Sequence, residues 1–164
     1  MADALKLAQK KLYTSQPKNN VEDGAMPSKG EFRPVGIVEA AGKEEARMRI
    51  FPEFCDALKG IEGFSHVIIL YWFHLRDNEK ERNVLQVVPR RHAKNVKVGV
   101  FACRSPSRPN LIGLCVVELV KVKDCILIVK GLDAFESSPI IDVKPYIPRG
   151  DAVPDAHTPE WVLS

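Results

Sequence analysis

The sequence contains no long hydrophobic run. Its longest uncharged apolar stretch, residues 67–73, is far shorter than the roughly 20 residues that a membrane-spanning helix needs. Residues 1–9 hold no apolar segment of the kind found in a signal peptide. Hydrophobic residues make up 45% and charged residues 27% of the chain, which is typical of a soluble domain that buries a core. This composition excludes an integral membrane protein, a collagen-like fibre and a secreted disulfide miniprotein, and it favours a cytoplasmic protein.

Cysteine is scarce, and no two cysteines form a CxxC pair. The four cysteines stand at positions 55, 103, 115 and 125, and none has a zinc-ligand spacing with any of the four histidines. We therefore expect free, buried thiols in a reducing compartment and no metal site. The sequence also has no Walker motif, no GxSxG nucleophile turn and no HExxH helix.

Three parts are expected along the chain. Residues 1–30 are polar and interrupted by proline and glycine, which predicts a flexible extension or an arm that docks on a partner. Residues 31–148 form the predicted domain, and residues 149–164 form a tail whose Trp161 folds back onto the domain or onto a partner subunit.

Strands dominate the predicted domain. We expect one helical turn, at residues 53–59, and strands at residues 32–38, 47–50, 66–74, 96–101, 112–120, 125–130 and 140–146. The long helices of a doubly wound α/β fold are missing. The sequence therefore predicts a mostly all-β fold, a small single-sheet antiparallel β-barrel of about seven strands.

Positive charge is concentrated in one part of the chain. Residues 76–108 contain nine Lys or Arg and three acidic residues, a net charge of +6, whereas the whole chain carries +3. We call this stretch the basic belt; it includes Arg90 and Arg91, which follow Pro89. Such a belt attracts phosphates, as in a nucleic acid, although a solvated loop would have the same composition.

The most informative segment is residues 100–114, which joins two apolar strands. Pro106 and Pro109 stiffen it, so that Arg104 and Arg108 are held in a fixed geometry. Arginine forms paired hydrogen bonds with carboxylates and phosphates, and a rigid pair therefore suits an anionic ligand. Asn110 can read a base edge.

A second segment, residues 131–146, carries acidic groups that can accept ribose hydroxyls or hold a cation. Asp142 and Lys144 lie on the same face of a strand and can pair with each other, so a salt-bridged strand edge is an equally open interpretation.

Three motifs in order resemble the TrmO (YaeB-like) family of tRNA methyltransferases. The segment GIEGFSHVIILYWFH (60–74) is similar to the family's GLEGFSHLWLIFWFH, GVFACRSPSRPNLIGLC (99–115) to GVFATRSPFRPNPIGLS, and ESSPIIDVKPY (136–146) to DGTPVLDIKPY. The resemblance covers residues 32–148. It implies a small β-barrel that acts as a homodimer and uses S-adenosyl-L-methionine (SAM) to methylate N6 of threonylcarbamoyl-adenosine at position 37, in the tRNA anticodon loop.

The resemblance also implies roles for individual residues. The implied cofactor contacts are Phe73, His74, Arg104, the backbone of Leu114, and Ala134, Phe135, Glu136 and Ser137. The implied substrate contacts are Arg90, Arg91, Arg108 and Asn110, and the motif that closes the site supplies Asp142, Lys144 and Tyr146 as catalytic residues.

The sequence departs from the family pattern in three places. Residues 36–42 lack the PRQ sequence of many members, Glu136 to Ser138 replace DGT, and Leu111 replaces the second proline of RPNP. Two alternatives therefore stay open: an RNA-binding barrel without catalysis, and a SAM-dependent enzyme that methylates a small molecule.

Overall fold

The computed structural model describes residues 31–42, 44–89 and 96–162. The chain divides into two units, Met1–Glu31 and Phe32–Ser164, and the fold below is that of the second unit. The predicted extension at residues 1–30 lies outside the described residues, as do Arg90 and Arg91 of the basic belt.

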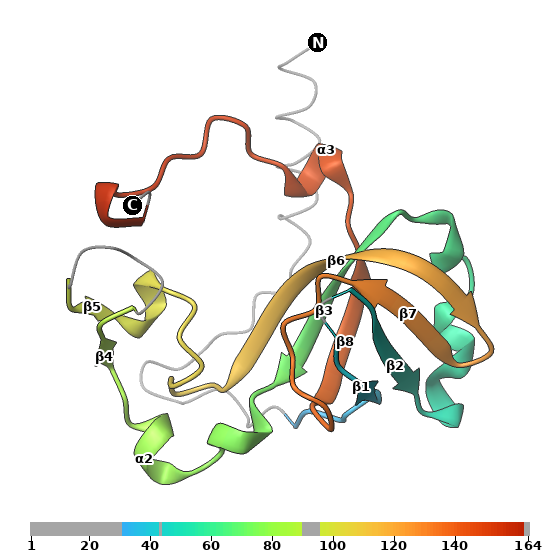
Figure 1. Cartoon of the computed structure of the whole chain (residues 1–164), viewed down its shortest axis with the longest axis horizontal. Helices are drawn as coiled ribbons and strands as arrows, with labels where there is room; N and C mark the ends of the chain where they lie inside the picture. The colour runs from blue at the N-terminus through green and yellow to red at the C-terminus, as the bar shows by residue number, and fades with distance from the viewer. Residues whose placement is uncertain (1–30, 43, 90–95, 163–164) are drawn as a thin grey trace, which may run out of the picture. The chain divides into compact units, whose positions relative to one another are not determined.

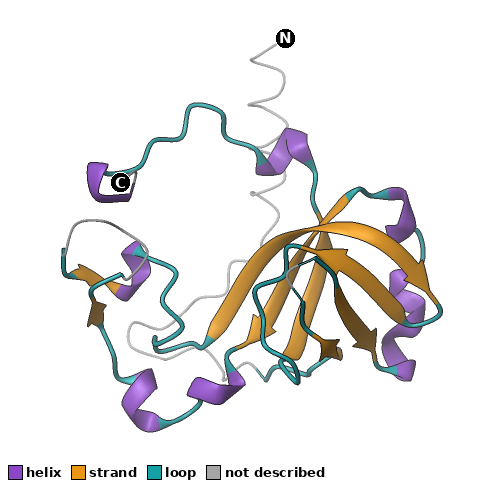
Figure 2. Ribbon diagram, in the orientation of Figure 1, coloured by secondary structure: helices purple, strands orange, loops and turns teal. Residues whose placement is uncertain are grey.

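Six antiparallel strands close into a barrel in the order β1-β2-β7-β6-β3-β8 (Figures 1 and 2). They are β1 (Gly36–Ala40), β2 (Ala46–Ile50), β3 (His66–Trp72), β6 (Ile112–Lys123), β7 (Ile126–Lys130) and β8 (Pro139–Pro145). The barrel closes because β1 pairs with β8 as well as with β2. The predicted all-β barrel is confirmed, with six strands in its wall in place of about seven.

Side chains that alternate along the strands fill the barrel. In β3, Val67, Ile69 and Tyr71 point inward and are at most 3% exposed. Met48 of β2 and Leu127 of β7 are fully buried beside them. Burial of such apolar side chains contributes most of the stability of a small domain.

Short helical segments connect the strands. The predicted turn at residues 53–59 is confirmed as the 3-10 helix η1 (Pro52–Leu58), and Gly60, with φ of 88°, ends it in the left-handed region. The others are η2 (Ile61–Gly63), η3 (His74–Arg76), α2 (Glu79–Arg82), η4 (Val100–Ala102), α3 (Pro148–Asp151) and η5 (Glu160–Val162). None of the helices in the described ranges is long and apolar enough to cross a membrane.

One predicted strand is not part of the barrel. Of residues 96–101, only β5 (Val98–Gly99) is extended, and it pairs with β4 (Gln86–Val87) in a separate two-stranded sheet. The chain leaves the barrel after Trp72 and re-enters it at Ile112, and these two residues are direct partners in the register of β3 and β6. We call residues 73–111 the excursion.

The expectation of four free thiols is wrong for two of the cysteines. Cys55 of η1 and Cys125, in the turn between β6 and β7, form a disulfide, with their Cα atoms 5.2 Å apart. The two are 70 residues apart in the sequence, so only the closed barrel brings η1 next to this turn. Cys103 and Cys115 are free and half-buried.

Candidate functional site

One end of the barrel gathers the residues implied as cofactor contacts. We call it the rim: the residues after β3, the start of β6, and the loop between β7 and β8. The backbone N–H of Phe73 donates to the Leu111 carbonyl at 2.8 Å. His74 Nδ1 lies 3.3 Å from the hydroxyl of Ser138, which is 2% exposed. These two contacts join the end of β3 to both other parts of the rim.

The loop between β7 and β8 is anchored by alternate residues. Leu132 and Ala134 are buried in the core, whereas Asp133, Glu136 and Phe135 face solvent, the last with 69% of its surface exposed. Ser137 adopts a positive φ of 65°, and its N–H donates to a carbonyl of β1 at 2.8 Å. The loop therefore presents carboxylates and an aromatic ring from a fixed backbone.

Two side chains, Tyr71 and Cys115, brace this loop from inside, and Gly113 leaves room for the Tyr71 ring. The Tyr71 hydroxyl donates to Asp133 Oδ1, and the Cys115 thiol donates to the Gly131 carbonyl at 3.1 Å. Gly113 is the direct partner of Tyr71, and a Cβ at Gly113 would overlap the Tyr71 ring. A glycine opposite a buried aromatic residue becomes visible only when the register of the two strands is known.

Electrostatics link the loop to Arg104. Burial raises the pKa of the Cys115 thiol, and the neighbouring Asp133 carboxylate adds to this effect. The positive charge of Arg104 lowers the pKa of the Cys115 thiol and so partly offsets these two effects. Arg104 is exposed, and among the described residues it forms no ion pair or hydrogen bond. Its guanidinium is therefore available to an anion at the rim.

Arg108 shapes the segment that carries Arg104. Its Nε donates to the Ser105 carbonyl at 2.8 Å, and its Nη2 donates to the carbonyls of Val100 and Cys103, each at 2.6 Å. These bonds hold the turn from inside and leave the Nη1 hydrogens for a ligand. Asn110, at the end of the same segment, is exposed.

Helix α2 supports this segment from the other side. Ser107 donates to the Glu81 carboxylate, and Arg82 donates to the Pro109 carbonyl at 3.3 Å. The Ser107 hydroxyl holds the pKa of Glu81 below its usual value, and Arg76 adds to this effect.

Part of the basic belt is neutralised by its own acids. Arg82 pairs with Asp77 at 2.8 Å and lies over the Trp72 ring, and Arg76 pairs with Glu81 at 3.1 Å. The positive charge that remains available to a ligand therefore comes from the other cations of the basic belt, including Arg104.

The residues implied as catalytic lie along β8, or directly after it in the case of Tyr146, away from the rim. Asp142 pairs with Lys144 at 2.7 Å, so the strand-edge ion pair considered above does form. At about 3.3 Å per residue, Asp142 lies about 10 Å along the strand from Pro139, where the rim begins, and Tyr146 roughly 23 Å. Tyr146 instead packs edge-on against His66, with ring centroids 6.5 Å apart.

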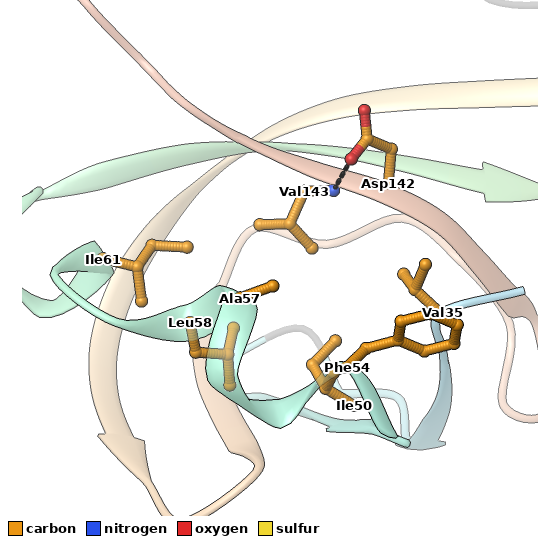
Figure 3. Close-up of a pocket in the computed structure, with 8 residues that line it drawn as sticks. All are labelled: Val35, Ile50, Phe54, Ala57, Leu58, Ile61, Asp142 and Val143. Carbon is orange, nitrogen blue, oxygen red and sulfur yellow. Dashed lines mark hydrogen bonds between the residues drawn. The ribbon is translucent and has the colours of Figure 1, made fainter. Parts of the chain in front are cut away.

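Asp142 also borders a small apolar pocket between η1 and β8 (Figure 3). The pocket measures about 110 Å³ and is lined by Val35, Ile50, Phe54, Ala57, Leu58, Ile61, Asp142 and Val143. Figure 3 shows one Asp142 oxygen turned back to accept from the Val143 N–H, at 2.9 Å. A pocket for a cofactor-sized molecule usually exceeds roughly 300 Å³, and this one is too small.

The side chains of the rim suit SAM in their chemistry. SAM carries an adenine, ribose hydroxyls, a sulfonium cation and an α-carboxylate. Exposed Phe135 offers a stacking surface, the carboxylates of Asp133 and Glu136 offer acceptors, and Arg104 offers an unpaired cation.

Comparison with known proteins identifies the family. The family model described as the tRNA-methyltransferase O N-terminal domain matches residues 25–152. The chain belongs to the TrmO family. A probable S-adenosyl-L-methionine-binding protein of Methanothermobacter thermautotrophicus is 50% identical over 128 residues, which cover 70% of this chain and 88% of that protein. The family expected from the three motifs is confirmed.

Two further relatives of the TrmO family are longer than this chain. The tRNA (adenine(37)-N6)-methyltransferase of Escherichia coli is 38% identical over 137 residues, which cover 79% of this chain and 57% of that enzyme. The crystal structure of TrmO from Pseudomonas aeruginosa matches with a TM-score of 0.61 and 29% identity, covering 79% of this chain and 62% of that one. The names of these relatives support the expected enzyme class, a SAM-dependent tRNA methyltransferase, and the expected cofactor, SAM.

Proposed function

We propose that this protein binds SAM at the rim and transfers its methyl group to N6 of threonylcarbamoyl-adenosine at position 37 of tRNA. One observation supports the proposal most directly. Within a domain of the TrmO family, exposed Arg104 lies near enough to Cys115 for its charge to lower the pKa of the thiol, and Cys115 is hydrogen-bonded to Gly131 of the carboxylate-bearing loop between β7 and β8. The anticodon loop as the target, a cytoplasmic location and a homodimeric state belong to the same proposal.

Each cofactor contact has a role that follows from its position. Arg104 binds the α-carboxylate, Glu136 accepts from the ribose hydroxyls, and Phe73 and Phe135 flank the adenine. His74, Leu114, Ala134 and Ser137 complete the rim, with Leu114 making its contact through the backbone. Bound SAM supplies a methyl group already activated on a sulfonium. The protein therefore has mainly to hold the acceptor nitrogen in line with that methyl group and to exclude water.

The acceptor side of the site is formed by the excursion. Asn110 reads a base edge, and the Nη1 of Arg108 and the side chains of Arg90 and Arg91 meet phosphates of the anticodon loop. The threonylcarbamoyl group makes the proton on N6 easier to lose, so a weak base or water is sufficient.

The proposed homodimer gives the β8 residues a role. A single chain holds Asp142, Lys144 and Tyr146 away from its own rim, so we assign them to the rim of a second copy. The outer face of β3 and β6 supports such an association. Leu70 stands opposite Leu114, and Ile68 opposite Val116; Leu114 and Val116 are 45% and 44% exposed. Leu70 and Ile68 are also the direct partners of Asp142 and Lys144.

The test is a calorimetric titration with SAM, with ATP as the control ligand. We expect SAM-selective binding, at least tenfold weaker in Arg104→Ala and unchanged in Arg149→Ala, an exposed arginine on α3. Mass spectrometry of nucleosides from tRNA incubated with enzyme and SAM should then show one added methyl group on threonylcarbamoyl-adenosine.

Three results would contradict parts of the proposal. Absence of SAM binding would favour the RNA-binding barrel without catalysis. SAM binding without methylated tRNA would favour a small-molecule acceptor. Unchanged SAM affinity in Arg104→Ala would remove Arg104 from the site.

A further inference from the structure

A second basic surface lies on the barrel wall, outside the rim and the excursion. It is a shallow groove of about 220 Å³ across the outer faces of β2, β7 and β6. Its lining residues are Arg47, Lys121, Lys123, Asp124, Ile126 and Ile128. None of them belongs to the three motifs that identify the family.

The strand register arranges these residues in two parallel rows. In β7, Ile128 is the partner of Arg47 on one side and of Lys121 on the other. Ile126, which lies two residues before Ile128 in β7, is in the same way the partner of Arg49 on one side and of Lys123 on the other. Each row therefore reads cation, isoleucine, cation, and neighbouring rows are about 7 Å apart.

A register shift in β6 makes this arrangement possible. Leu119 pairs with Val129, but the next partner of β7, Ile128, faces Lys121, so one residue of β6 is skipped. The shift moves Lys121 and Lys123 onto the outer face in line with the isoleucines. Without it, Val120 and Val122 would occupy these two register positions.

The groove keeps a positive charge after its own acids are counted. Glu39 pairs with both Arg47 and Arg49, and Asp124 lies at the edge of the groove. Arg47, Lys121, Lys123 and the neighbouring Arg49 carry four positive charges, and Glu39 and Asp124 carry two negative ones, which leaves a net charge of +2. Lys121 and Lys123 are exposed and form no ion pair or hydrogen bond with any residue in the described part of the chain.

We propose that this groove binds the phosphate backbone of the tRNA substrate, at a stem adjoining the loop that is methylated. Lysines on one side meet successive phosphates, and the apolar floor accepts the sugar face between them. Phosphate contacts of this kind orient a nucleic acid without reading its sequence.

The position of the groove fits an extended substrate. Along β6, Lys121 lies roughly 23 Å from Leu114 at the rim. A folded tRNA is longer than this, so one molecule can reach the rim with its loop and the groove with its stem. Duplex RNA is recognised mostly by its shape and phosphates, which requires cations and no base contacts. The inference rests on the proposed function, because it takes tRNA as the substrate.

The test is the salt dependence of tRNA binding. Affinity for unmodified tRNA is measured by fluorescence anisotropy at several KCl concentrations, for the wild type and for Lys121→Gln/Lys123→Gln. Each lost phosphate contact lowers the slope of log affinity against log salt by about 0.7 to 0.9. We therefore expect the double variant to lose about 1.4 to 1.8 of the slope and to bind SAM like the wild type.

Two controls make the result specific. Lys59→Gln/Arg149→Gln removes the same charge from exposed positions outside the groove, and its slope should match that of the wild type. Lys121→Arg/Lys123→Arg keeps the charge and should restore the slope.

The possible failures are distinguishable. If the wild type binds tRNA with a steep slope that the double variant keeps, the groove does not hold RNA and the inference is wrong. An equal loss in the Lys59/Arg149 control also overturns the inference, since the effect would then be one of net charge. If the wild type binds SAM but no tRNA, the proposed substrate fails, and the inference fails with it.

Discussion

The Cys55–Cys125 disulfide gives the most direct test of the fold. It closes a loop of 70 residues, the sequence separation of the two cysteines. In the chain-entropy model, a loop of this length restricts the unfolded state enough to stabilise the fold by about 4 kcal/mol. For a domain of this size, such a loss lowers the Tm by roughly 15 °C.

The perturbation can be made in two independent ways. One is reduction with a small thiol reductant, and the other is the double substitution Cys55→Ala/Cys125→Ala. Both should lower the Tm, measured by circular dichroism, by similar amounts. The double variant should not respond further to the reductant. Cys103→Ser, which changes a free cysteine, should keep the full response to reduction.

Thiol counting supplies the refutation. Of the four cysteines, two are paired, so the unfolded but unreduced protein should react with two equivalents of a thiol reagent. Four reactive thiols, or a Tm that reduction leaves unchanged, would show that η1 and the β6–β7 turn are not linked.

Three further predictions concern the rim. Gly113→Ala places a Cβ in the Tyr71 ring and should destabilise the fold by about 1–3 kcal/mol in urea denaturation; an unchanged midpoint would contradict the register. Arg108→Lys keeps the charge but loses the fork that binds three carbonyls, so SAM affinity should fall nearly as far as in Arg108→Ala, and full rescue by lysine would contradict a shaping role. The pKa of Cys115 is raised above its ordinary value of 9.0, so its contribution to stability is complete below that pH and is lost as the pH rises through the folded-state value. Alkylation of Cys115 at pH 9 should accordingly be slower in the folded than in the unfolded protein, and equal rates would contradict the burial of this thiol.

The strands of the barrel were predictable because their residues repeat with a clear period. Val67, Ile69 and Tyr71 alternate with less buried neighbours, and this pattern survives in the structure. The strand expected at residues 96–101 failed because a short apolar run does not reveal its partner. It pairs locally with Gln86–Val87 and then turns into a helix at Val100.

The site was predictable as a set of residues, but its internal support was not. Sequence alone singled out Arg104 and Arg108 as one pair, whereas the structure gives them different surroundings. The Arg108 guanidinium is occupied by backbone carbonyls, which have no signature in the sequence. The disulfide escaped prediction for a related reason, since a pairing across 70 residues depends on closure of the barrel.

The excursion has both of its ends fixed by a single pair of residues. Trp72 and Ile112 are Cα partners, so the chain departs and returns about 5 Å apart, the spacing of neighbouring strands. A short turn could join the same two residues without altering the register of β3 and β6. The barrel can therefore keep its structure when the sequence or length of the excursion changes. Substrate preference can therefore diverge in evolution by changes within residues 73–111, while the fold and the proposed cofactor contacts Phe73, His74 and Arg104 stay the same.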